Sequence, residues 1–498
     1  MSHRMVTSKN RPRKYWILLL VLPLMWLLFN AVSVTAQSAR HYTELEFPPA
    51  PEFVLPPFER FELDNGMVVY LMQDRELPLV SGTALIRTGD RWEPGNKTGL
   101  GQILGQVLRT GGTTQHSPNE LNELLERRAA SVETGVDTTS ASASFNALSQ
   151  DLDDVFGLFA EVLRTPAFAP EQIELAKRQQ AGAIARRNDS PSAIASREFQ
   201  KLIYGESSPY ARTVEYKTLG NISRADVVQF YQRYFHPNNM ILGIVGDFET
   251  AEMRSLIEQE FGDWKPGEPV SKNIAELSPT AQAQQGGVFF VERPQLTQRT
   301  IQIGHLGGEL SSPDYPALSV LNGVMNGFGG RLFNQVRSRE GLAYSVYGVW
   351  SPRFDYPGMF VAGGQTRSEA TVPFIQSVFR EIERIRTEPI TAEELQYAQD
   401  TTLNSFIFNF ADPSQTLSRL MRYEYYGYPE DFIFQYRRGV EATTIEDVQR
   451  VAQKYLNPDQ LVTLVVGNAT EINPPLSSLT PDTTVTSIDI SIPEPSGS

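Results

Sequence analysis

The feature that most constrains this chain is an internal repeat. The segment SRADVVQFYQRYFHPNNMILGIVGD (223–247) matches TIEDVQRVAQKYLNPDQLVTLVVGN (444–468) at a constant shift of 221 residues. The identical positions include the pairs Asp226 and Asp447, Val227 and Val448, Tyr234 and Tyr455, Pro237 and Pro458, and Gly246 and Gly467. Each copy is typical of an amphipathic helix, a proline-containing turn and an apolar strand that ends at glycine. A second pair, 169–180 and 391–402, matches at a shift of 222 and predicts two helix starts. One structural unit is therefore used twice.

The repeat sets the domain boundaries. We predict an N-terminal domain over 57–261, a linker rich in Pro, Gly, Ala and Gln over 262–286, and a C-terminal domain over 287–470. Strands and helices are mixed rather than strictly alternating, which indicates α+β domains with helices covering a largely antiparallel sheet. The tail over 471–498 is rich in Pro, Ser and Thr, and we expect it to be disordered.

Composition excludes several classes of function. The chain has 44 Lys+Arg against 58 Asp+Glu, a net charge of −14, which argues against a nucleic-acid partner. Cysteine is absent, so disulfides, thiolate catalysis and iron–sulfur clusters are excluded. None of the five histidines lies within a helical turn of another, which excludes a zinc site built on a His pair at i, i+4.

The N-terminus resembles an export signal. Five Lys and Arg residues fall within 1–14, an uncharged apolar run covers 15–29, and Val34 and Ala36 have the small side chains of a cleavage site. We therefore predict a signal peptide over 1–36 and a polar, Pro-rich lead-in over 37–56. The alternative is an uncleaved membrane anchor formed by residues 15–35, since this stretch is just long enough to span a bilayer. Both interpretations predict an exported protein, periplasmic or extracellular.

The segment TGDRWEPGNKTGLGQILGQVLRTGGT (88–113) resembles the signature segment of the pitrilysin/insulinase family, which includes the mitochondrial processing peptidases. In active members this helix carries H-x-x-E-H, in which two His bind zinc and the Glu is the general base. A further Glu ligand follows on a second helix. The resemblance covers about residues 57–470 and implies two related α+β domains that form half of a clamshell.

This chain departs from the family pattern at every catalytic position. The two His positions hold Gln102 and Gln106, the general-base position holds Gly105, and the downstream ligand position holds Ala183. Gln binds zinc poorly, and Gly and Ala offer no ligand atom. We therefore expect no metal and no cofactor in this chain. The two Gln residues are either neutral remnants or a polar patch that still contacts peptide.

The second half resembles the family's C-terminal Arg/Tyr segment, GGRLFNQVRSREGLAYSVYG (329–348). The resemblance implies that Arg337 and Tyr344 point at the substrate backbone, where a guanidinium and a phenol would stabilise a developing oxyanion. Just upstream, Gly327, Gly329 and Gly330 resemble a shortened form of the glycine-rich loop of the non-catalytic processing-peptidase subunit. Each of these features also has a purely structural alternative: a solvated helical Arg, a packed strand Tyr, and a helix C-cap followed by a turn.

These observations predict a non-catalytic, substrate-binding subunit of an exported heterodimeric zinc peptidase. The partner would be a homologous H-x-x-E-H subunit that holds the zinc, and the substrate would be a peptide or an unfolded polypeptide. The alternative is a pseudo-peptidase scaffold or a peptide-binding protein with no active partner. An independent hydrolase is disfavoured because no G-x-S-x-G, Cys nucleophile or His cluster is present.

Overall fold

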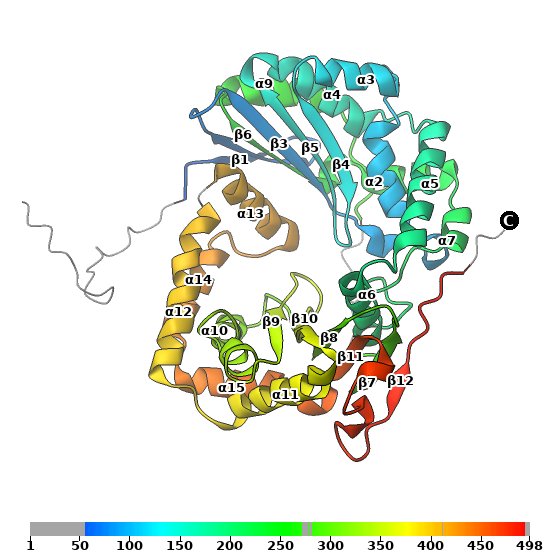
Figure 1. Cartoon of the computed structure of the whole chain (residues 1–498). Coiled ribbons are helices and arrows are strands. Elements are labelled where there is room, and N and C mark those ends of the chain that lie inside the picture. Colours follow the sequence, from blue (N-terminus) through cyan, green and yellow to red (C-terminus); the bar gives the residue numbers. More distant parts are fainter. Residues whose placement is uncertain (1–54, 271–276, 278–280, 411, 494–498) are drawn as a thin grey trace, which may run out of the picture. The chain divides into compact units, whose positions relative to one another are not determined.

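The structure is a computed structural model that describes residues 55–270, 277, 281–410 and 412–493 (Figure 1). The predicted signal peptide, nearly all of the lead-in and the middle of the predicted linker lie outside these residues. Within the described residues, no helix combines the length and the apolar character that crossing a membrane requires.

Two six-stranded sheets form the framework, one in each half of the sequence. The strands of the first sheet are β1 (Glu59–Glu62), β2 (Val68–Gln73), β3 (Leu79–Ile86), β4 (Ser131–Val136), β5 (Ala141–Leu148) and β6 (Met240–Gly246). Those of the second sheet are β7 (Gly287–Glu292), β8 (Gln298–Leu306), β9 (Ala343–Ser351), β10 (Met359–Arg367), β11 (Val462–Gly467) and β12 (Val485–Ser487).

The two sheets share one topology. The first has the order β1-β2-β6-β3-β5-β4 and the second β12-β7-β11-β8-β10-β9. The pairs β2–β6 and β7–β11 are parallel, and the next three pairs of each sheet are antiparallel. The edge strands β1 and β12 differ, because β1 is antiparallel to β2 whereas β12 is parallel to β7. The predicted fold class, two related α+β domains with mixed, largely antiparallel sheets, is confirmed.

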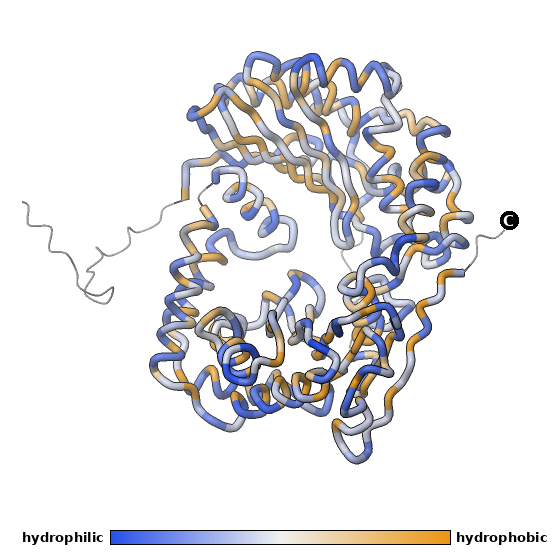
Figure 2. The backbone as a smooth tube through the Cα atoms, in the orientation of Figure 1, coloured by the Kyte–Doolittle hydropathy of each residue, from blue (hydrophilic) through white to orange (hydrophobic). Residues whose placement is uncertain are grey.

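Amphipathic helices cover each sheet, with hydrophilic and hydrophobic residues alternating along them (Figure 2). The helices of the first half are α2 (Leu100–Thr110), α3 (Pro118–Glu126), α4 (Leu152–Arg164), α5 (Pro170–Arg186), α6 (Pro191–Tyr204), α7 (Tyr216–Gly220), α8 (Arg224–Tyr234) and α9 (Thr250–Phe261). Those of the second half are α10 (Tyr315–Met325), the π-helix η7 (Phe333–Arg339), α11 (Thr371–Thr387), α12 (Ala392–Phe406), α13 (Pro413–Tyr426), α14 (Phe432–Ala442) and α15 (Ile445–Tyr455). Each half buries its own large apolar core.

Two equivalent helices are exchanged between the halves. Helix α6 of the first half packs on β8 and β11, where Phe199 and Ile203 meet Val462 and Leu464 in a shared apolar cluster (Figure 1). Helix α13 of the second half packs on β6 and β2, in a separate cluster that contains Leu417. Because each exchanged helix fills an apolar sheet face of the other half, neither half buries its sheet alone.

The repeated helices α8 and α15 begin with the same N-terminal device. In α15 the Thr444 hydroxyl accepts a hydrogen bond from the Asp447 backbone N–H at 3.1 Å, and the Asp447 carboxylate accepts one from the Thr444 N–H at 3.2 Å. Ser223 and Asp226 form the same reciprocal pair at the start of α8. Such a capping box satisfies two backbone donors that the helix itself leaves unpaired.

Removing one cap is expected to cost a modest amount of stability. We expect Thr444→Ala to lower the free energy of unfolding by about 1 kcal/mol, measured by urea denaturation, because the Asp447 N–H loses its acceptor. The control is Thr401→Ala on the exposed face of α12, where the same chemical change removes no cap. Equal stability of the two variants would contradict the capping role.

The predicted disorder of the tail is wrong for residues 471–493. Strand β12 pairs with β7, and the Ile488 N–H donates to the Phe290 carbonyl at 2.8 Å. Asn188 Nδ2 donates to the Ile490 carbonyl at 2.7 Å. Composition misled the prediction because a few apolar residues at alternate positions suffice here. Ile488 and Ile490 pack on the cluster that α6 forms with the second sheet, and Ile492 packs on the first core.

Candidate functional site

The positions of the absent zinc motif lie on two helices of the first half. Gln102, Gly105 and Gln106 lie on α2, and Ala183 lies on α5. Gln106 Nε2 donates a hydrogen bond to Gln179 Oε1, so the two helices are joined by amides where the family's motif would place ligands. Gln102 and Ala183 are exposed, whereas Gly105 is buried.

The backbone of β4 lies against Gly105. A Cβ atom built at Gly105 would lie 2.5 Å from the Val136 nitrogen and 2.9 Å from the Gly135 carbonyl carbon. The Thr134 hydroxyl also donates to the Gly105 carbonyl at 2.6 Å, which holds the strand on the helix. The position that a general-base glutamate would occupy therefore has no room for any side chain.

The residues present do not fit a zinc ion. Zinc in proteins is held by His, Cys, Asp or Glu, normally by at least three of them. In the part of the chain that the structure describes, no three such side chains come close enough together to hold a metal. The Gln amide oxygens are weak ligands, and Gln106 is already engaged with Gln179.

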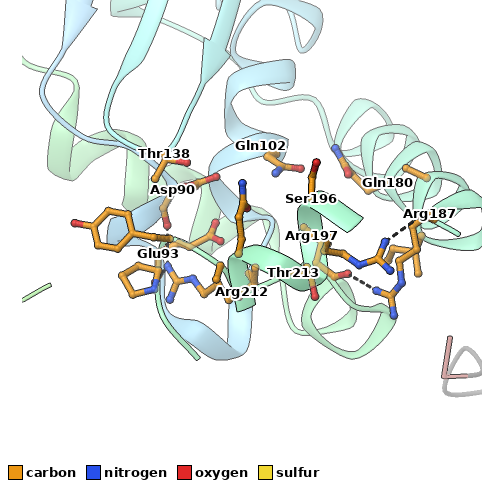
Figure 3. A pocket seen from close by; sticks show the side chains of 18 of the residues that line it. Asp90, Glu93, Gln102, Thr138, Gln180, Arg187, Ser196, Arg197, Arg212 and Thr213 are labelled. Atoms are coloured by element: carbon orange, nitrogen blue, oxygen red, sulfur yellow. Dashed lines mark hydrogen bonds between the residues drawn. The ribbon is translucent and has the colours of Figure 1, made fainter. Parts of the chain in front are cut away.

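A polar pocket of about 530 Å³ opens beside the degenerate motif (Figure 3). Gln102 and Ala183 line it, with Asp90 and Glu93 on one side and Arg187 and Arg197 on the other. Arg197 Nη1 donates to the Arg187 carbonyl at 2.9 Å. The pocket therefore presents amide, carboxyl and guanidinium groups to a polar chain, and among its lining residues none is His or Cys.

Burial controls the protonation of the two carboxyl groups in this pocket. It raises the pKa of Glu93 to about 7, although the carboxylate accepts the Gly99 and Gly101 backbone N–H groups at 3.0 and 2.8 Å. Burial likewise raises the pKa of Asp90 to about 6, with nearby Arg212 opposing the rise. Both residues line the pocket, and Glu93 also anchors the first turn of α2 through its backbone contacts.

The raised pKa of Asp90 makes stability depend on pH. Between 3.8, the ordinary Asp value, and about 6, the folded protein keeps the Asp90 proton that the unfolded chain releases, so the free energy of unfolding falls as pH rises. We expect Asp90→Asn to remove roughly 3 kcal/mol of this fall, at about 1.4 kcal/mol per pH unit, measured by urea denaturation across the window. Asp189→Asn, at an exposed position, is the control, and parallel curves for Asp90→Asn and wild type would contradict the assignment.

Arg337 and Tyr344 are brought together in the second half. The Arg337 Cζ lies 5.0 Å from the centre of the Tyr344 ring and 4.6 Å from the centre of the Phe333 ring. Phe333 in turn contacts Phe328 edge to face, with ring centres 5.0 Å apart. The four side chains form one stack, named here the Arg337 stack, whose ends are open: Tyr344 is 83% exposed and Phe328 is 80% exposed.

Two backbone irregularities place this stack. Arg337 lies on η7, a π-helix, a rare geometry that is frequent at functional sites. Tyr344 is the extra residue of a β-bulge, because Ser345 pairs with Gln365 while Ala343 pairs with Thr366. A bulge changes the direction of a side chain, and β9 is the edge strand of its sheet.

The predicted glycine loop lies between α10 and η7, and side chains of α12 form hydrogen bonds with it. Gly327 has φ +76°, which glycine adopts most readily, and the Gly329 N–H donates to the Tyr397 hydroxyl at 3.1 Å. Buried Arg331 makes two bonds to Glu394, at 2.6 and 2.9 Å. Gly330 leaves no room for a Cβ atom, which would lie 2.1 Å from the Asn326 carbonyl oxygen. The loop is a helix end and turn that is fixed at its base and presents Phe328.

The structure thus separates the predicted site residues into two sets. The zinc-motif positions lie at α2 and α5, beside the edge strand β4 of the first sheet, and the Arg/Tyr pair lies at the edge strand β9 of the second. Sequence reasoning missed Phe328 and Phe333, which complete the Arg337 stack, and Asp90, which faces the pocket. Phe328 could have been found from the sequence, because a phenylalanine between two glycines is a signal for an exposed aromatic side chain in a loop.

Comparisons with known proteins agree with this geometry. Residues 69–209 match the family described as insulinase (peptidase family M16), and residues 221–402 match the one described as peptidase M16 inactive domain. The uncharacterized zinc protease YmxG of Bacillus subtilis is 21% identical over 411 residues, 82% of this chain and 98% of that protein. The non-peptidase homolog YmxG of Helicobacter pylori is 22% identical over 403 residues, 80% of this chain and 89% of that protein.

Solved structures share the fold. The peptidase M16 inactive domain from Pseudomonas fluorescens has a TM-score of 0.73 at 25% identity, covering 83% of this chain and 98% of that one. A protease from Helicobacter pylori has a TM-score of 0.71 at 19% identity, covering 83% and 100%. The resemblance and fold predicted from the sequence are confirmed. The match to the inactive-domain family agrees with the prediction that this chain is not catalytic alone.

Proposed function

Because this chain belongs to peptidase family M16, the insulinase family, and has lost every residue of the zinc motif, we propose that it is the non-catalytic, substrate-binding subunit of a heterodimeric zinc peptidase. Its partner would be a homologous H-x-x-E-H subunit that holds the zinc. The observation that carries this proposal is the Arg337 stack, in which a guanidinium and an exposed phenol are held side by side.

The chemistry of the stack supports a role toward a peptide carbonyl. Hydrolysis of an amide turns its carbonyl oxygen into an oxyanion, and the Arg337 and Tyr344 N–H and O–H groups are strong donors to such an oxygen. The exposed ring of Phe328 offers an apolar contact to a neighbouring side chain of the substrate. Arg337 and Tyr344 would bind and orient the substrate, and a zinc ion held by the partner would supply the activated water.

The chain keeps Arg337 and Tyr344 although its zinc-motif positions hold no ligands. This combination favours a subunit of a complex over a free-standing scaffold. A protein that served structure alone would have no need of an exposed Tyr placed by a β-bulge on an edge strand. A relative from Helicobacter pylori carries the name non-peptidase homolog, and others carry the name zinc protease, so the family contains candidates for both members of a pair.

The proposal includes export. The basic residues of 1–14, the apolar run of 15–29 and the small residues before position 37 support a signal peptide or an anchor. The heterodimer would then work outside the cytoplasmic membrane.

The test is purification of the tagged full-length protein from its native envelope fraction, with partner identification and zinc analysis. We expect an H-x-x-E-H relative to co-purify in equal amount, with about one zinc per pair. If the protein elutes alone and without metal, the heterodimer is wrong and the scaffold or peptide-binding function replaces it.

A further inference from the structure

A second, smaller cavity lies where the two halves meet, away from the residues of the degenerate motif. It has a volume of about 250 Å³ and is named here the Arg87 pocket. Its lining residues from the first half include Arg87, Thr88, Arg91 and Trp92, and those from the second include Asp355 and the end of α13 at Tyr425 and Tyr426. Since one water accounts for about 30 Å³, the space corresponds to a small organic molecule rather than to a single ion.

The polar atoms around this pocket are unusually poor in protein partners. Arg87 Nε, Arg91 Nε and Nη1, the Thr88 hydroxyl and Asp355 Oδ1 are all buried and have no hydrogen-bond partner among the described residues. Arg91 is 4% exposed, and its remaining nitrogen, Nη2, donates to Asp355 Oδ2 at 3.0 Å. Buried polar groups are normally paired, so such a concentration in one place calls for a ligand.

Among the described residues, Arg87 is the arginine of this pocket that forms no salt bridge. Arg91 is paired with Asp355, and Glu424 is paired with Arg60 at 2.9 Å and accepts from the Tyr70 hydroxyl at 3.0 Å. Within the described part of the chain, the Arg87 side chain has a 3.5 Å contact from Nη2 to the Glu424 carbonyl and lies 5.4 Å from the centre of the Tyr425 ring. The Glu424 carboxylate also lines the pocket and acts on Arg87 through its charge, but it forms no salt bridge with Arg87. A half-buried guanidinium without a salt bridge favours an anion beside it.

The pattern of donors and acceptors defines the ligand further. The unpartnered guanidinium N–H groups of Arg87 and Arg91 match the oxygens of a carboxylate, for which guanidinium has the right geometry. The unpartnered Asp355 Oδ1 needs a donor instead. The aromatic rings of Trp92, Tyr425 and Tyr426 complete the wall and suit an apolar body.

We propose that the Arg87 pocket binds a small carboxylic acid with an ammonium group next to its carboxylate, the chemistry of a free α-amino acid. The carboxylate accepts from Arg87 and Arg91, and the ammonium donates to Asp355. Residues of both halves line the pocket, so the ligand stabilises the interface between the two halves. This site does not depend on the Arg337 stack or on a partner subunit.

The experiment is isothermal titration calorimetry of the full chain with L-alanine, L-valine and L-phenylalanine. We expect at least one of the three to bind, and its deaminated analogue (propionate, isovalerate or 3-phenylpropionate) to bind about tenfold more weakly because Asp355 then lacks its donor. Arg87→Gln should weaken binding by about tenfold or more, since it removes a charge-assisted hydrogen bond. Arg178→Gln, at an exposed position of α5, is the matched control and should bind as the wild type does.

Thr88→Val provides a second variant that keeps the shape of a fully buried side chain and should weaken binding several-fold. The proposal is overturned if none of the three amino acids binds at millimolar concentration, or if Arg87→Gln and Thr88→Val both bind as tightly as the wild type. Equal binding of an amino acid and its deaminated analogue would also overturn it, since Asp355 would then recognise nothing. Binding of inorganic phosphate alone would do the same.

Discussion

Replacing Arg337 by alanine and Tyr344 by phenylalanine together is expected to lower kcat/KM of the proposed complex with a zinc-bearing partner by about 10²–10³-fold. The double change removes the Arg337 guanidinium, whose Cζ lies 5.0 Å from the centre of the Tyr344 ring, and the hydroxyl of that ring. Loss of a donor to a developing oxyanion acts on the transition state, so kcat should fall more than KM rises. The measurement is steady-state hydrolysis of a peptide by the reconstituted pair.

The structure offers a sharp control for this experiment. Arg339→Ala removes a second arginine from the same π-helix, where Arg339 is exposed and contacts Gln335 at 3.3 Å. We expect that variant to retain nearly full activity. Because Tyr344 is 83% exposed, the double variant should unfold at the wild-type temperature, which separates a local loss from misfolding. Full activity of the double variant would remove the substrate-binding role from the pair.

Much of the fold follows from the repeat. The matching segments around 223–247 and 444–468 become α8 with β6 and α15 with β11, each helix with the same capping box and each strand at the same place in its sheet. Such local patterns can be read from the sequence because capping, amphipathic spacing and strand composition act over a few residues.

Long-range features could not be read in the same way. The amphipathic face of α6 predicts a helix that packs on something, but not that Phe199 meets Val462 and Leu464 on the sheet of the other half. The prediction for the tail fails for a related reason, because Val485 and Ile488 are held by β7 and by the cluster that α6 forms, both far away in the sequence. Propensity is local, whereas burial is decided by the partner surface.

The candidate site divides in the same manner. The family resemblance identified Arg337 and Tyr344 as candidate site residues. Their contact, however, depends on a π-helix and a β-bulge, which no local sequence pattern predicts. The Gly105 position was expected only to lack a base. The structure adds that the backbone of β4 lies against Gly105, so that the position lacks both the glutamate and the space for one.

That close contact leads to the second large expected effect. We expect Gly105→Ala to lower the free energy of unfolding by about 1–3 kcal/mol, because its new methyl group would lie 2.5 Å from the Val136 nitrogen and force β4 away from α2. Gly157→Ala in α4 is the matched control, since no described atom outside its own stretch of helix lies within 4 Å of its Cβ position. There the same substitution should stabilise the helix by roughly 0.5–1 kcal/mol. Urea denaturation of the two variants measures both effects, and equal effects would contradict the steric argument.

Restoring all four residues of the zinc motif should therefore not produce an active peptidase. The triple variant Gln102→His, Gln106→His and Ala183→Glu changes exposed or half-buried side chains, so we expect it to fold with nearly wild-type stability. Adding Gly105→Glu should cost about 3 kcal/mol or more, since it combines the backbone clash with burial of a carboxylate between α2 and β4. Denaturation of the triple and quadruple variants isolates this cost, and a peptide assay of the quadruple variant should show no hydrolysis. A stable, active quadruple variant would mean that β4 can move aside, and that loss of the ligands alone had silenced this site.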